Sequence, residues 1–155
     1  MKKYLSTLLC GLLLNAAALA HGDVELGPNG GRILEFSKNE SMHGEVLVKD
    51  NNFHVALLDK ELRPVTLTEQ ELTATSGDRA KPEKLAVEKK DGKFVVPAVK
   101  AGEWVVFQFR AGAKAKPVTA RMQYDLTVCG GCKEPEWICK CAANKGKAQA
   151  GNGKK

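Results

Sequence analysis

Residues 118–126 read VTARMQYDL, and apolar side chains alternate with polar ones along the whole stretch. An alternation with a period of two predicts a β-strand that buries one face and leaves the other in water. The face predicted to be buried carries Val118, Ala120, Met122, Tyr124 and Leu126. This strand is the clearest one in the sequence, and the neighbouring segments repeat its pattern.

The same alternation flanks a turn signal at residues 49–52, which read KDNN. Polar residues of this kind between two alternating segments predict a β-hairpin. A further strand is predicted over residues 103–110. The apolar faces of these three segments carry Met42, Val46, Val48, Phe53, Val55, Leu57, Val105, Phe107 and Phe109.

Shorter segments complete a pattern of about nine strands, and no stretch of residues 21–155 shows an apolar helical face. A tight hairpin is predicted at Asp91-Gly92, and residues 76–83 read as a polar surface loop. The sequence therefore predicts an all-β fold, a single antiparallel β-sandwich, with a small β-barrel as the alternative. The additional strands are predicted over residues 32–36, 65–68, 72–75, 85–89 and 94–96.

The first twenty residues have the features of a cleavable signal peptide. Lys2 and Lys3 precede an apolar run over residues 5–14, and Ala18-Leu19-Ala20 forms a cleavage signal. The run is too short to span a membrane, so stable membrane insertion is not expected. The predicted location is the periplasm, where an even number of cysteines is typical of disulfide formation.

The formal net charge of the 155 residues is +6, which at first suggests a nucleic-acid partner. Six of the 24 basic residues, however, lie in the predicted signal peptide and in the final stretch 142–155. The remaining 18 basic residues match the 18 acidic ones, so the body is formally neutral. A neutral exported protein is not expected to bind nucleic acid.

Sequence composition divides the exported chain into four parts. Residues 21–31 (HGDVELGPNGG) form a glycine-rich arm that is predicted to be flexible, and residues 32–128 form the β-sandwich domain. Residues 129–141 contain four cysteines, and residues 142–155 form a basic tail without apolar periodicity that is predicted to be disordered.

The four cysteines have the spacing Cys129-x2-Cys132-x6-Cys139-x-Cys141. Thiolates are soft ligands that suit zinc or copper(I), so a metal site is one prediction. Gly130-Gly131 allows the tight turn by which Cys129 and Cys132 can chelate one ion.

Two other uses of the cysteines remain open. Nested disulfides 129–141 and 132–139 are geometrically easier than a bridge between Cys139 and Cys141. Redox catalysis by the first pair is disfavoured, because such a motif normally opens a helix, whereas here a strand precedes it and Pro135 follows. Trp137 is predicted to be a packing anchor.

The three histidines are the other candidate ligands. Cleavage after Ala20 would give His21 a free α-amine beside its imidazole, a pair that suits copper(II). His43 and His54 are predicted on one face of neighbouring strands but four residues apart, about 14 Å along the sheet. At most one of them can therefore join His21, and the alternative interpretation is that both are ordinary surface residues.

The stretches GPNGGRILEF (27–36) and MHGEVLVKDNNFHVALLDKELRPVTL (42–67) follow a histidine-containing arm. Residues 21–68 resemble the N-terminal part of periplasmic adaptor subunits of resistance-nodulation-division metal efflux pumps. The resemblance implies a metal-related periplasmic role, with copper, zinc, cobalt or silver as candidates. The chain departs from these adaptors because it lacks their long helical hairpin and lipoyl-like segments and has a single histidine in its arm.

These observations lead to one functional hypothesis and one rival. The hypothesis is a periplasmic metal-binding protein that handles or buffers copper or zinc, possesses no enzymatic activity and is linked to a metal efflux pump. The rival is a protein-interaction module that two disulfides staple together. The candidate metal ligands are His21, His43, His54, Cys129, Cys132, Cys139 and Cys141.

Overall fold

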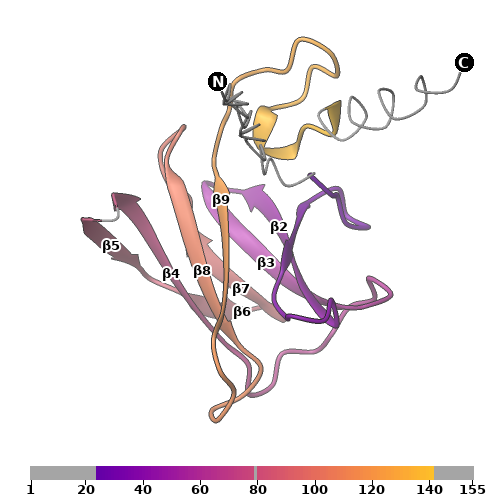
Figure 1. Ribbon diagram of the computed structural model, residues 1–155, viewed down its shortest axis with the longest axis vertical. Helices are drawn as coiled ribbons and strands as arrows, with labels where there is room; N and C mark the ends of the chain where they lie inside the picture. The colour runs from indigo at the N-terminus through magenta and orange to yellow at the C-terminus, as the bar shows by residue number, and fades with distance from the viewer. Residues whose placement is uncertain (1–23, 79, 142–155) are drawn as a thin grey trace, which may run out of the picture.

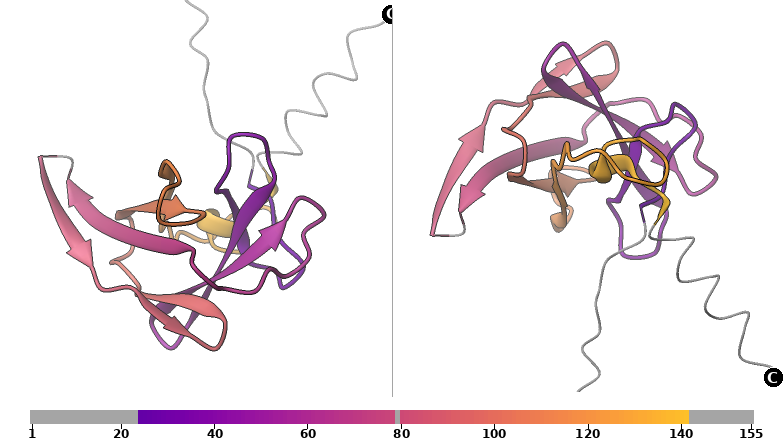
Figure 2. Two further views of the ribbon diagram at one scale, coloured as in Figure 1. Left: turned by 90° about the horizontal axis from the view of Figure 1, so that it is seen from below. Right: turned by 90° about the horizontal axis from the view of Figure 1, so that it is seen from above.

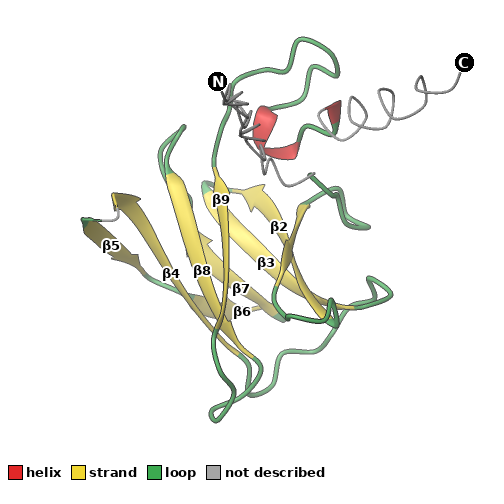
Figure 3. Cartoon of the chain, viewed as in Figure 1, coloured by secondary structure: helices red, strands yellow, loops and turns green. Residues whose placement is uncertain are grey.

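The computed structural model describes residues 24–78 and 80–141 (Figure 1). The predicted signal peptide, His21 and the tail 142–155 lie outside the described residues. The named elements within the described residues are nine strands and one short 3-10 helix. Figure 3 distinguishes strands, helix and connecting loops by colour. They are β1 (Arg32–Glu35), β2 (Met42–Lys49), β3 (Asn52–Asp59), β4 (Glu71–Asp78), β5 (Lys81–Leu85), β6 (Glu88–Lys90), β7 (Lys93–Pro97), β8 (Trp104–Arg110), β9 (Val118–Gln123) and η1 (Glu136–Ile138).

The strands form two antiparallel sheets that face each other (Figure 2). One sheet has the order β1-β2-β3-β7-β6 and the other has the order β5-β4-β8-β9. The sheets do not close into a barrel, so the predicted β-sandwich is confirmed and the barrel alternative is wrong. Within the described residues, no helix is both long enough and apolar enough to cross a membrane.

The core lies between the sheets and includes most of the predicted alternating positions. Phe53 of β3 and Phe107 of β8 are completely buried, and their rings meet edge to face with centroids 6.4 Å apart. Phe36, just after β1, stacks on Phe109 of β8 at 4.9 Å. Aromatic pairs add to the hydrophobic effect of burial, so these contacts fix one sheet against the other.

The two predicted hairpin turns are confirmed. Asp50 and Asn51 adopt φ values of 50° and 56° between β2 and β3, and Asp91 and Gly92 adopt 51° and 70° between β6 and β7. Positive φ at both central residues gives the twist that two-residue hairpin loops require.

Four local predictions are wrong. Residues 76–78 of β4 pair with residues 81–83 of β5, so this segment belongs to a hairpin, and its polar composition reflects its place at a sheet edge. Residues 65–68 form no strand, and residues 85–89 cross from one sheet to the other. β9 ends at Gln123 because the chain then turns, with the N–H of Thr127 donating to Asp125 Oδ1, so Leu126 is 41% exposed.

The outer face of the larger sheet carries a buried acid, Glu45 of β2, which is 0% exposed. The loop at residues 27–31 covers it and donates to its carboxyl group. The backbone N–H groups of Asn29 and Gly31 lie 2.8 and 3.1 Å from Oε1, and Asn29 Nδ2 lies 2.7 Å from Oε2. The described part of the predicted arm, residues 24–31, is therefore packed on the sheet.

The close approach of Glu45 and its strand explains two glycines of this loop, Gly27 and Gly31. A Cβ atom placed on Gly27 would lie 2.6 Å from the carboxyl carbon of Glu45. A Cβ atom placed on Gly31 would lie 2.6 Å from the carbonyl oxygen of Val46 and 2.8 Å from Glu45 Cγ. All three distances are shorter than a real Cβ atom allows, so a side chain at either position would force the carboxyl group or the strand to shift.

Candidate metal centre

The four cysteines lie in a folded segment that follows β9 and covers one end of the sandwich (Figure 1). Its backbone doubles back on itself, since the N–H of Cys129 donates to the carbonyl oxygen of Glu134 at 2.9 Å. The N–H of Glu136 likewise donates to the carbonyl of Thr127 at 2.9 Å. This return, followed by η1, brings the second pair of cysteines back to the first.

Trp137 of η1 anchors the segment to the core, as the sequence predicts. Its side chain is 7% exposed, and its ring contacts the ring of Tyr124 with centroids 5.6 Å apart. Tyr124 in turn meets Phe53 of β3 at 5.1 Å. A chain of aromatic contacts thus runs from the sandwich core to the turn that carries Cys139.

Arg32 makes a second connection to this segment. Its Nη1 donates to the carbonyl oxygen of Trp137 at 3.0 Å, which joins the start of β1 to η1. Burial of the guanidinium lowers the pKa of Arg32 from its usual value. Since Arg32 directly follows the loop that covers Glu45, the described amino-terminal segment and the cysteine segment meet at one end of the molecule.

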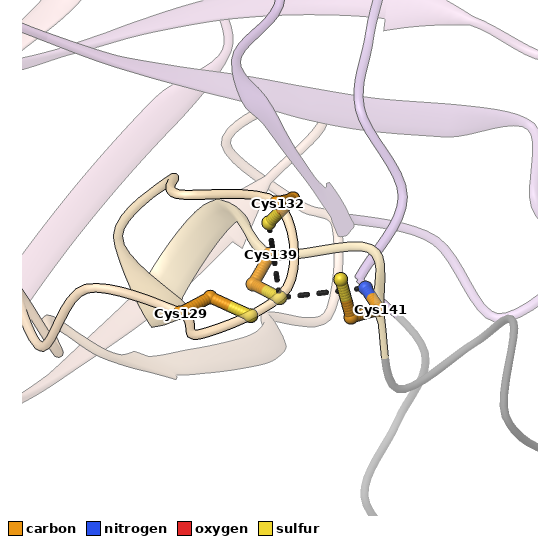
Figure 4. A group of neighbouring side chains, drawn as sticks. All are labelled: Cys129, Cys132, Cys139 and Cys141. Carbon is orange, nitrogen blue, oxygen red and sulfur yellow. Dashed lines mark hydrogen bonds between the residues drawn. The ribbon is translucent and has the colours of Figure 1, made fainter.

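The four cysteine sulfur atoms all lie within 4.8 Å of one another (Figure 4). The sulfurs of Cys132 and Cys139 are 3.6 Å apart, and the backbone N–H of Cys141 donates to Cys139 Sγ at 3.4 Å. All four are free thiols. Within the described residues, this is the one group of three or more histidine, cysteine or acidic side chains that could hold a metal ion.

The crowding of the thiols redistributes their protons. The backbone N–H of Cys132, with help from the Cys139 thiol and the N–H of Gly131, lowers the pKa of Cys129 to about 7. The N–H of Cys141 acts in the same direction on Cys139, but its neighbours Cys129 and Cys132 together with burial raise the pKa of Cys139 to about 12. The thiols of Cys132 and Cys129 also raise the pKa of Cys141.

The arrangement therefore favours one thiolate among neighbours that resist further ionisation. A cation at the centre of the group would remove that resistance, because it neutralises the repulsion between adjacent thiolates. Four sulfurs at the zinc–sulfur distance of 2.3 Å sit about 3.8 Å from one another. The four sulfurs lie within 4.8 Å of one another, and Cys132 and Cys139 are 3.6 Å apart, so only a small rearrangement is needed to reach that tetrahedron.

Proton release on metal binding should depend on pH. Metal coordination requires thiolates, so binding displaces the protons that remain on the cysteines. Because the pKa of Cys129 is about 7, this residue gives up a proton at pH 6 but is already ionised at pH 8. We expect the number of protons released on zinc binding to fall by about one between pH 6 and pH 8. Calorimetric titration in buffers of different ionisation enthalpy measures this number, and an unchanged value would refute the assignment to Cys129.

The structure does not bring His43 or His54 to this centre. The predicted register is confirmed, with His43 opposite Leu58 and His54 opposite Leu47. His43 Nδ1 is 3.1 Å from the carbonyl oxygen of Asp59, and its Nε2 is 3.2 Å from Glu35 Oε2. Both nitrogens of His43 thus have local partners, and neither His43 nor His54 belongs to a described ligand group.

Two residues that position the centre are absent from the sequence-based set of candidates. Arg32 holds η1 through the Trp137 carbonyl, and Glu45 holds the loop that precedes Arg32. The glycines flanking Pro28-Asn29 indicate the loop in the sequence. No local feature shows that the loop contacts Glu45, which lies 14 or more residues away.

Comparison with protein-family models, with curated proteins and with solved structures finds no match to this chain.

Proposed function

We propose that the protein is an exported metal-binding protein whose four-cysteine centre holds zinc or copper(I), with zinc as the preferred ion, and that it acts without turnover. The observation that carries this proposal is the convergence of four sulfurs within 4.8 Å. A compact set of four thiolates suits tetrahedral zinc, and soft sulfur ligands also suit copper(I).

The cellular setting is part of the same proposal. The export features of residues 1–20 support a periplasmic location, and the resemblance of residues 21–68 to metal efflux adaptors supports a link to heavy-metal resistance. A component of such a pump is the partner that we propose. The test is co-purification of the full chain with the pump's periplasmic subunits from cells grown in excess zinc or copper, and absence of co-purification would remove this partner.

Metal binding should stabilise the fold, because Cys129 and Cys139 are buried and Trp137 joins the core. At free zinc 1,000-fold above the dissociation constant, a site absent from the unfolded chain stabilises the protein by about 4 kcal/mol. We expect the zinc-loaded protein to melt well above the metal-free protein in a calorimetric scan. Elemental analysis of the same sample should give one metal ion per chain.

The disulfide-stapled interaction module predicts a different result for this sample. Four oxidised cysteines and no bound metal after exposure to zinc and copper(I) would overturn the metal-binding proposal. A count of free thiols in the denatured protein, made beside the elemental analysis, separates the two outcomes.

A further inference from the structure

The four cysteines differ in their access to solvent. Cys132 is exposed and Cys141 is partly exposed, whereas Cys129 and Cys139 are 7% and 4% exposed. A dissolved reagent therefore meets Cys132 first. Cys139 lies behind it, at the end of η1 and beneath the turn that carries Cys132 (Figure 4).

The exposed sulfur and the most buried one are also in contact. Cys132 Sγ lies 3.6 Å from Cys139 Sγ. A disulfide bond has a length near 2.05 Å, so the two atoms need to close a gap of about 1.5 Å. A bridge between Cys139 and Cys141 is less favourable, because it would close a strained ring.

We propose that Cys132 and Cys139 form a redox pair that releases the metal ion when the centre reacts with a small-molecule disulfide, such as oxidised glutathione. This inference rests on the proposed function, since it describes how the ion of that site is released. It adds a regulatory reaction to a site that otherwise only binds.

The reaction proceeds by two thiol–disulfide exchanges. The thiolate of Cys132 attacks the oxidant and displaces one thiolate, which leaves a mixed disulfide on Cys132. The thiolate of Cys139 then attacks Cys132 Sγ and displaces the second thiolate. The two cysteines are oxidised, the oxidant is reduced to two thiols that take up protons from the solvent, and the metal ion leaves because two of its four ligands are consumed.

Only Cys129 and Cys141 would remain as ligands after this reaction. Loss of two thiolates removes about half of the binding free energy of a four-cysteine site, so the zinc affinity should fall at least about 1,000-fold. Reduction of the disulfide should restore the original affinity, which makes the release reversible.

The test uses the zinc-loaded full chain and oxidised glutathione. Zinc release is followed with a chromogenic chelator, and disulfides are mapped by mass spectrometry of peptides. We expect the 132–139 disulfide to appear at the rate of zinc release and reductant to reverse both. Release without this disulfide, or a first disulfide between any other pair, would overturn the proposal.

Two variants and the metal-free protein complete the design. In Cys132→Ser, the rate at which the first disulfide forms should fall at least about tenfold. Cys141→Ser, the control, should still form the 132–139 disulfide. The same mapping on metal-free protein tests the pairing even if a variant binds zinc poorly. A chain that forms the 132–139 disulfide but never holds metal would refute the proposed function and leave the pairing intact, so the two failures are distinguishable.

Discussion

Replacing Cys139 with serine should weaken zinc binding by about 100-fold and remove most of the stabilisation that the metal provides. Four-ligand zinc sites in small domains contribute about 10–16 kcal/mol, so one thiolate accounts for about 3 kcal/mol, or about 100-fold in affinity. Cys139 is the most informative position, because its sulfur contacts both Cys132 Sγ and the N–H of Cys141. A competition titration against a chelator of known affinity measures the change.

A matched control for this experiment is His54→Asn. His54 is a predicted ligand that the structure leaves outside the cysteine centre. Its replacement should leave the zinc affinity and the melting temperature of the zinc-loaded protein unchanged. A loss comparable to that of Cys139→Ser would show that the bound ion sits near the histidines instead, and would contradict the assignment of the centre.

The features of the fold that are predictable from sequence are those that repeat locally. Alternation marks the buried faces of β3 and β8, where Phe53 and Phe107 are completely buried. Turn residues mark the loop at Asp50 and Asn51, whose φ values are positive. The cysteine cluster is likewise visible, because its members are close in sequence and Trp137 stands between them.

The features that sequence reasoning misses depend on contacts between distant segments. Glu45 follows the alternation expected of a solvent-facing residue, yet a loop of distant residues covers it. Similarly, the outer part of the β4–β5 hairpin, residues 76–78 and 80–83, carries mostly polar residues because it lies at a sheet edge, so its composition indicates a loop. Neither the partner of Glu45 nor the contact from Arg32 to Trp137 leaves a periodic signal.

Replacing Glu45 with alanine should destabilise the protein by about 4 kcal/mol. The change removes the acceptor of three N–H groups and leaves a cavity beneath the loop at residues 27–31. Each buried donor that loses its acceptor costs about 1–3 kcal/mol, and water that enters the cavity reduces the summed cost of the three donors. Because whole domains are stable by about 5–15 kcal/mol, this single change removes a large share of the total.

The size of this effect depends on the acceptor oxygens, and Glu45→Gln tests that explanation. The amide oxygen can still accept from the N–H groups of Asn29 and Gly31, and Asn29 can turn its own side-chain oxygen toward the new amide. We therefore expect Glu45→Gln to lower the free energy of unfolding by only about 1 kcal/mol. Asn29→Ala, which removes one hydrogen bond to Glu45, should cost about the same. Urea denaturation of the metal-free variants gives these values from the transition midpoint. If Glu45→Ala and Glu45→Gln are equally unstable, the negative charge itself holds the loop. If both variants are as stable as the unsubstituted protein, other contacts hold the loop. In that case Glu45 does not organise the end of the sandwich where Arg32 contacts the cysteine segment.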